Sequence, residues 1–191
     1  VVVRVGILAE IIGIAWAGFI IGPDAAWGWL IPALGVYGFG VGLATAQLTG
    51  VILQDVPVEK SGQGSGTQST SRQVGSALGV AILGTVLFTT TGGALAASLD
   101  DAGVPPAEAD QVVTAVVDSA GGAIAGLAAD PATADSADAA RTAFSDGTRA
   151  AAWTAAGFLV VGLGATLALG RSRNDDEDDT ADAAPASAAA D

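Results

Sequence analysis

Glu10 lies inside an apolar segment, which makes it the side chain best suited to proton or cation chemistry within a membrane. It follows Arg4 by six residues, about 9 Å along a helix, so it lies within the hydrocarbon if Arg4 marks the boundary. A carboxyl group there can bind and release a proton or pair with a cationic substrate. Gly6, Gly13 and Ala17 share its helical face, which indicates that this face meets other helices or a cavity rather than lipid. Alternatively, Glu10 forms a structural hydrogen bond or extends toward the cytoplasmic interface.

The other polar candidates lie at or near the edge of the membrane. Gln47, in the second apolar segment, can line a central cavity or form a hydrogen bond between helices. Asp55, Glu59 and Arg72 belong to the polar segment that follows it. We expect Arg72 to anchor the interface or to pair with Asp55 or Glu59.

Composition excludes several function classes. The 191 residues include no cysteine and no histidine, so disulfides, thiolate nucleophiles and the common zinc ligands are absent. We therefore expect no enzyme activity, no metal site and no cofactor. The net charge of −13 argues against nucleic-acid binding, which requires a basic surface. The sequence lacks methionine and begins with three valines, so we expect a fragment or a processed chain.

Hydrophobicity predicts an all-α membrane protein with four transmembrane helices. Hydrophobic residues make up 51% of the chain, charged residues make up 14%, and the mean hydropathy is +0.54. Each apolar run approaches or exceeds the ~20 residues that a helix needs to cross a bilayer. The four runs cover residues 5–21, 29–53, 74–91 and 151–170.

The charge pattern predicts the domain organisation and orientation. Residues 1–98 form three transmembrane helices with short loops, 99–150 an acidic extracytoplasmic loop, 151–170 the last transmembrane helix, and 171–191 a disordered acidic tail. We expect a multi-pass protein of the plasma membrane. Basic residues favour the cytoplasmic side of a membrane, so both ends of this chain are expected in the cytoplasm. The basic residues that fall on that side are Arg4, Lys60, Arg72, Arg171 and Arg173.

Two short amphipathic helices are predicted within the extracytoplasmic loop. Pro105 and Pro106 open a segment whose valines recur at helical spacing, and Asp130 before Pro131 is typical of a helix start. The loop gates an exit path, binds a partner or acts as a solvated acidic connector, and its Ala/Asp composition favours the connector.

Glycines on three of the apolar segments indicate close helix packing, because small residues let helix backbones approach in a bilayer. We expect packing more than direct substrate contact at any single one of them. They are Gly35, Gly38 and Gly42 on the second segment, Gly75 and Gly79 on the third, and Gly157 and Gly164 on the fourth.

Two motifs resemble a known family. Residues 57–84, PVEKSGQGSGTQSTSRQVGSALGVAILG, and residues 35–49, GVYGFGVGLATAQLT, are similar to the C-terminal region of major facilitator superfamily (MFS) transporters. They are most similar to the fourteen-helix drug:proton antiporter branch, the EmrB/QacA-like efflux pumps. A long extracytoplasmic loop before the last helix is a further similarity.

The resemblance implies a function. The four helices correspond to the last four of an MFS fold that exports hydrophobic or cationic small molecules by alternating access, in exchange for protons. The partners are then the lipid bilayer and the N-terminal half of the transporter, which this chain lacks. The resemblance also implies that Asp55, Glu59 and Arg72 form a latch that holds one conformation.

Two other hypotheses remain. One is a self-contained four-helix small multidrug transporter that works as an oligomer, in which Glu10 has the central role. The other is a non-transport membrane protein with an assembly or sensing function in the loop at residues 100–146.

Overall fold

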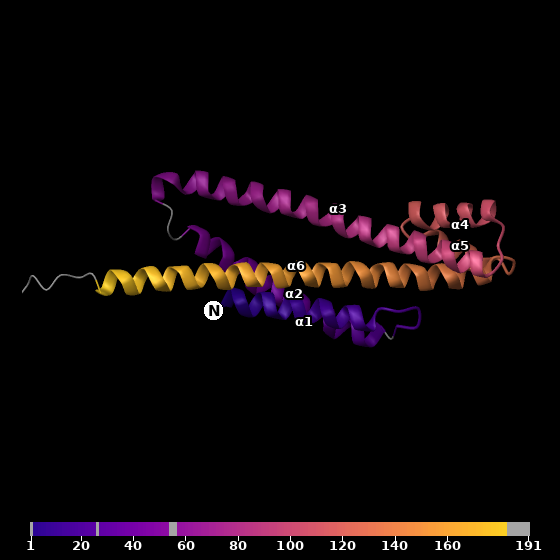
Figure 1. The fold of residues 1–191 in the computed structure, drawn as a ribbon, viewed down its shortest axis with the longest axis horizontal. Helices are drawn as coiled ribbons and strands as arrows, with labels where there is room; N and C mark the ends of the chain where they lie inside the picture. The colour runs from indigo at the N-terminus through magenta and orange to yellow at the C-terminus, as the bar shows by residue number, and fades with distance from the viewer. Residues whose placement is uncertain (1, 26, 54–56, 183–191) are drawn as a thin grey trace, which may run out of the picture.

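The computed structural model describes residues 2–25, 27–53 and 57–182, and their regular structure is helical throughout (Figure 1). Four of the described helices contain stretches long and apolar enough to cross a membrane. The prediction of an all-α membrane protein with four transmembrane helices is confirmed. The elements are α1 (Val2–Ile20), α2 (Trp27–Leu53), the short 3₁₀ helix η1 (Val58–Lys60), α3 (Ser61–Asp101), α4 (Pro106–Asp118), α5 (Ala123–Ala129) and α6 (Ala134–Asp182).

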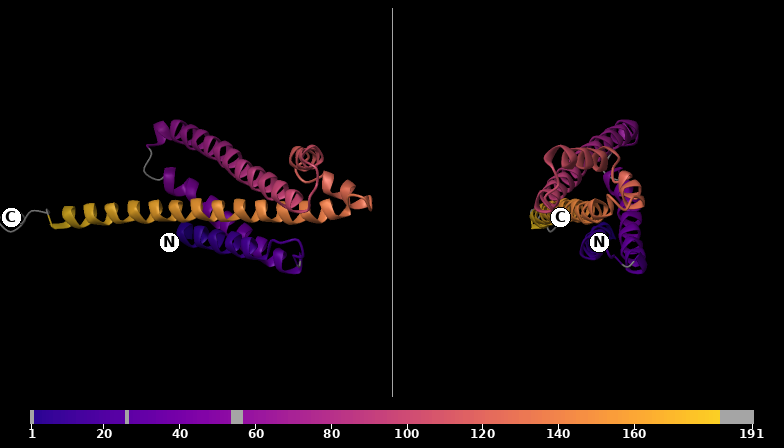
Figure 2. Two further views of the ribbon diagram at one scale, coloured as in Figure 1. Left: turned by 45° about the vertical axis from the view of Figure 1, so that its right-hand side comes forward. Right: turned by 90° about the vertical axis from the view of Figure 1, so that its right-hand side faces the viewer.

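Helix α6 runs through the middle of the arrangement (Figures 1 and 2). The α1 and α2 helices pack against each other on one side of it, and α3 lies on the other side. The α3 and α6 helices meet near α4 and α5 and diverge toward the opposite end (Figure 1). The two sides of the molecule are therefore connected mainly through α6.

Both α3 and α6 are longer than the sequence predicted. With 41 and 49 residues they extend for about 61 and 73 Å, roughly twice a ~30 Å hydrocarbon core. Residues 61–73, expected in a loop, are helical in α3, and residues 134–150, also expected in a loop, belong to α6. The tail expected to be disordered from residue 171 continues as α6 to Asp182, and residues 183–191 lie outside the described residues. Extending an existing helix costs less than starting one, so polar segments adjoining a transmembrane helix can continue it.

A small apolar core joins α4 to the ends of α3 and α6. Pro106 occupies the first position of α4, where a proline costs no hydrogen bond, as the sequence predicted. Side chains three and four residues apart on α4 then face the two long helices. The buried members of this core are Leu95, Leu99, Ala109, Val112, Val116, Ala140 and Ala143.

The second predicted short helix differs in detail. The Asp130 side chain accepts a hydrogen bond from the Ala132 amide at 2.9 Å, and the Asp130 carbonyl accepts one from the Thr133 amide at 3.0 Å. The helix that follows is α6 itself, which begins at Ala134, and the short α5 precedes Asp130. The Asp130-Pro131 signal therefore predicts the start of the last long helix.

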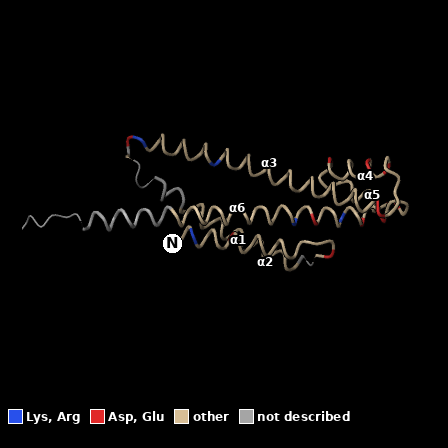
Figure 3. Tube along the Cα trace, in the orientation of Figure 1, with Lys and Arg blue, Asp and Glu red and all other residues tan. Residues whose placement is uncertain are grey.

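A group of acidic residues lies at one end of the molecule (Figure 3). Figure 3 shows acidic residues gathered around α4, α5 and the start of α6. Asp101, Glu108 and Asp110 in this region are exposed. Lys60 lies at the opposite end of α3. This region is the helical part of the predicted extracytoplasmic loop, and we refer to α4, α5 and the adjoining ends of α3 and α6 as the acidic cap.

The crossing of α3 and α6 depends on Gly147. A Cβ at this position would meet the Thr91 hydroxyl and would lie 2.6 Å from the Leu87 carbonyl oxygen. The Thr91 side chain is fully buried, and its hydroxyl has no hydrogen-bond partner among the described residues. Only glycine permits this approach.

We expect Gly147→Ala to lower the free energy of unfolding by about 1–3 kcal/mol, since the added methyl forces α3 and α6 apart. The measurement is thermal unfolding of the purified protein in detergent. Gly164→Ala is the matched control, because a Cβ at Gly164 meets nothing within 4 Å and alanine favours a helix. Equal loss of stability in the two variants would show that Gly147 has no special packing role.

Candidate functional site

Glu10 lies on the contact surface between α1 and α2. Gly6, Gly13 and Ala17, which share its face, are buried, so the prediction that this face meets another helix is confirmed. A Cβ at Gly6 would lie 2.8 Å from the Ala44 nitrogen, and one at Gly13 would lie 2.5 Å from the Tyr37 nitrogen. The two backbones are therefore in direct contact on both sides of Glu10.

The carboxyl group of Glu10 has no bonded partner among the residues that the structure describes. Its side chain is partly buried, and no hydrogen bond or ion pair joins it to another described residue. Glu10 is also the only carboxylate among the described residues of α1 and α2. The structural hydrogen bond considered as an alternative is not present among these residues. The group is thus available to a proton or to a cation.

Gln47 is not part of the Glu10 site. It is exposed, and it lies seven residues beyond Gly40, an α2 residue in close contact with Glu10, or about 10 Å along the helix. No hydrogen bond links Gln47 to Glu10 among the described residues. The role of Gln47 in lining a central cavity stays a prediction.

Two of the three predicted latch residues, Glu59 and Arg72, do not pair with each other in the part of the chain that the structure describes. Glu59 lies in η1, and Arg72 is separated from it by about three turns of α3, because the expected loop is helical. No ion pair joins Glu59 to Arg72, and both side chains are exposed. Asp55 lies outside the described residues.

Arg72 instead borders an open depression on α3. This depression has a volume of about 740 Å³. Its lining comes from one face of α3: Arg72, Gln73, Ser76, Ala77 and Val80. Because no second helix lines it, the depression does not form an enclosed site within this chain.

The glycines that bring helices together differ from the predicted set. At every predicted position a Cβ would meet nothing within 4 Å, so none of these glycines mediates a contact within the described chain: Gly35, Gly38, Gly42, Gly75, Gly79, Gly157 and Gly164. The close contacts use Gly6, Gly13, Gly40 and Gly147. Helical periodicity shows which glycines share a face, but it does not show which face meets a neighbouring helix.

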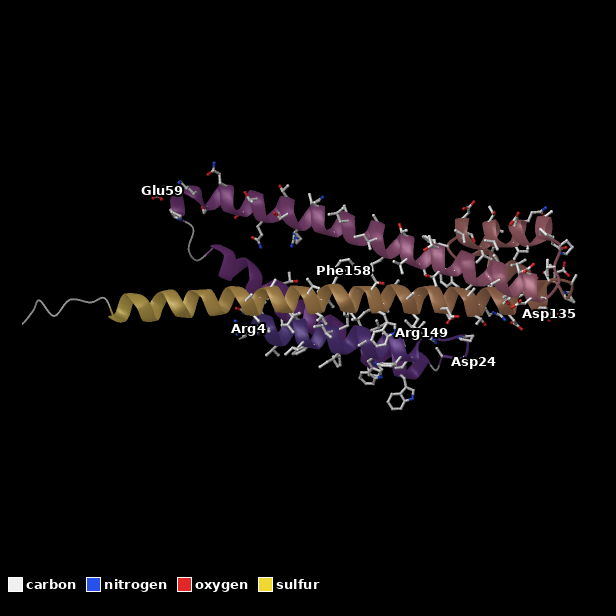
Figure 4. The ribbon with its side chains drawn as sticks, viewed as in Figure 1. Arg4, Asp24, Glu59, Asp135, Arg149 and Phe158 are labelled. Carbon is white, nitrogen blue, oxygen red and sulfur yellow. The ribbon has the colours of Figure 1, made fainter. Side chains whose placement is uncertain are left out.

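Arg149 joins α6 to α1, a role that the sequence did not predict. Its guanidinium donates two hydrogen bonds to the Ile21 carbonyl, from Nη2 at 2.6 Å and from Nε at 3.2 Å. The last carbonyls of a helix lack intrahelical partners, and a cation is favourable at that end. Asp146 lies 3.5 Å from the third guanidinium nitrogen. Figure 4 shows Arg149 beside the end of α1, with Asp24 in the loop that follows.

Aromatic packing reinforces the same junction. The Phe19 and Trp153 rings meet edge to face, with centroids 4.8 Å apart. Gly18 is buried against Trp153. A Cβ at Gly18 would lie 3.5 Å from the Trp153 ring. The α1 and α6 helices are therefore held together by packing and by a charged hydrogen bond at one end of α1.

Parts of this chain are similar to two curated transport-related proteins. A stretch of 91 residues, 48% of this chain, is 34% identical to the multidrug resistance protein Stp of Mycobacterium tuberculosis and covers 17% of that protein. A stretch of 72 residues, 38% of this chain, is 38% identical to a probable actinorhodin transporter of Streptomyces coelicolor and covers 12% of it. The chain therefore spans less than a fifth of the length of these relatives. No protein-family model matches the sequence, and no solved structure matches it significantly.

We expect Arg149→Ala to destabilise the junction of α1 and α6 by about 1 kcal/mol, because the Ile21 carbonyl loses its charged donor. Arg149→Lys should retain part of this stability, since an ammonium group can make one of the two bonds. Thermal unfolding in detergent measures the effect. Arg141→Ala is the control, because Arg141 forms an exposed ion pair with Asp138 on its own helix, and such pairs contribute little. If Arg141→Ala and Arg149→Ala are equally destabilising, the junction does not depend on the bond to Ile21.

Proposed function

We propose that this chain is the C-terminal part of a proton-coupled multidrug efflux transporter of the major facilitator superfamily, working by alternating access. The observation that carries the proposal is the similarity to a multidrug resistance protein and a probable antibiotic transporter, in a chain with four membrane-spanning helices. The motifs at residues 35–49 and 57–84 support the fourteen-helix drug:proton antiporter branch. The substrates of such a transporter are hydrophobic or cationic small molecules.

In this proposal Glu10 carries the proton or pairs with a cationic substrate. Two features support the role: the carboxyl group lies at membrane depth, and it has no bonded partner among the described residues. Its place at the contact between α1 and α2 adds a third feature, because a carboxyl group there responds to relative movement of the two helices.

Several glycines on α2 and α3 have open space beside them, as expected if these helices pack against further helices. Gly35, Gly38 and Gly42 lie on α2, and Gly75 and Gly79 lie on α3, where a Cβ would meet only open space. We propose that these faces pack against the N-terminal half of the transporter, because small residues favour close helix contact in a bilayer. Asp55, Glu59 and Arg72 then remain candidates for a cytoplasmic latch in the assembled protein.

The direct test of the proposal is drug export. The protein expressed from its complete reading frame, in a bacterium that lacks its own efflux pumps, should lower ethidium accumulation, and a protonophore should abolish this effect. Glu10→Gln should reduce export to the level of cells without the protein, because an amide cannot carry the proton. Glu108→Gln, which alters an exposed carboxylate of α4, is the matched control and should export normally.

Each outcome of the export test separates the hypotheses. Export that a protonophore does not affect would contradict proton coupling. Export by the 191-residue chain alone, as an oligomer, would favour the self-contained small transporter. Normal proton-driven export in Glu10→Gln would remove Glu10 from the mechanism.

Orientation in the plasma membrane can be tested with introduced cysteines, because the sequence contains none. With both ends cytoplasmic, Glu108→Cys in the acidic cap should react with a membrane-impermeant maleimide added to intact cells. Ser71→Cys on α3 should react only after the membrane is permeabilised. Both positions are exposed, so access to the thiol is limited by the membrane alone. The reverse pattern would invert the proposed topology.

A further inference from the structure

Gly40 is the residue of α2 that meets Glu10. It is buried, and a Cβ at this position would lie 2.6 Å from the Glu10 backbone nitrogen and 2.9 Å from Glu10 Cγ. The same Cβ would lie 2.6 Å from the Gly6 carbonyl oxygen. Cβ atoms do not approach other heavy atoms this closely, so any side chain at residue 40 would displace both the backbone of α1 and the base of the Glu10 side chain.

The space requirement is specific to this position on α2. Gly38 and Gly42 are two residues away on either side, and a Cβ at each would meet nothing within 4 Å. Gly13 makes an equally close contact in the same helix pair, because its Cβ would lie 2.5 Å from the Tyr37 nitrogen. That contact involves no atom of Glu10.

We propose that Gly40 is a positioning residue for Glu10, which sets the surroundings of the carboxyl group by letting α1 lie directly against α2. The inference rests on the proposed role of Glu10 in proton or cation binding. Gly40 acts through Glu10 and has no side chain with which to bind a substrate.

Among the described side chains, few titratable or charged groups belong to the elements packed against Glu10. The elements packed against α1 are α2, where Tyr37 is the titratable residue, and α6, where Asp146 and Arg149 lie at the outer end. Arg149 bonds to the carbonyl at the end of α1, about 16 Å along the helix from Glu10. Arg4 is six residues away on α1 itself. No hydrogen bond or ion pair joins any of these described groups to Glu10, so its depth between the two helices is the main structural determinant of the state of this carboxyl group.

The test is a measurement on Glu10 itself, made in membranes that contain the protein from its complete reading frame. Dicyclohexylcarbodiimide modifies protonated carboxyl groups within membranes, and mass spectrometry of the Glu10 peptide gives the labelled fraction as a function of pH. We expect Gly40→Ala to move the midpoint of this curve by about half a pH unit or more. Gly38→Ala should leave the curve unchanged, and Glu10→Gln should abolish the label.

Gly13→Ala is the control for general disturbance of the helix pair, because it strains the same contact without touching Glu10. Equal shifts in Gly13→Ala and Gly40→Ala, or no shift in either, would overturn the proposal. If Gly40→Ala does not accumulate, Gly6→Ala is the substitute variant. Its added methyl on α1 would push the two helices apart at the same place, since a Cβ at Gly6 would lie 3.0 Å from the Gly40 carbonyl oxygen. An unchanged midpoint in that variant would also overturn it. The labelling needs no transport, so its result is independent of whether Glu10→Gln impairs export.

Discussion

Direct contact between the backbones of α1 and α2 is possible only because Gly6, Gly13 and Gly40 have no Cβ. In a bilayer, burial of apolar side chains gives two helices little reason to associate, since lipid is equally apolar. Close packing supplies the attraction instead, and it operates only where small residues let the backbones meet. The position of Glu10 follows from this contact, because its own backbone forms part of the contact surface with Gly40.

Helix α6 joins this pair to the rest of the molecule by two different means. At Gly147 it crosses α3 so closely that the Thr91 hydroxyl is buried without a hydrogen-bond partner among the described residues. At Arg149, half a turn further along, it binds the free carbonyl at the end of α1 through a charged group. Both contacts lie toward the acidic cap, where α3, α4 and α6 share an apolar core. The opposite ends of α3 and α6 diverge, as Figure 1 shows.

The same distribution of contacts bears on the proposed transport function. One end of the chain is held by a packed core and by Arg149, whereas a Cβ at Gly38 or Gly75 would meet no other described residue within 4 Å. A piece of a larger transporter has such faces, because the remaining helices cover them. The relatives are more than five times longer than the stretch they share with this chain, which agrees with that view. Glu10 has no bonded partner among the described residues, and in the proposed transporter it pairs with protons, substrates or residues of the remaining helices.

The sequence by itself determined the helical class, the four membrane-spanning helices and the helical face on which Glu10 lies, because hydrophobicity and a 3.6-residue period depend only on the order of residues. It also located the start of α4 at Pro106. Only the tertiary structure decided that Gly40 and Gly147 make the close contacts and that Arg149 binds α1. Every glycine of a transmembrane helix permits close approach, so its partner depends on how the helices are arranged. Arg149 lies in a segment whose composition predicted a loop, and its acceptor is 128 residues away, a distance at which no local pattern indicates a contact.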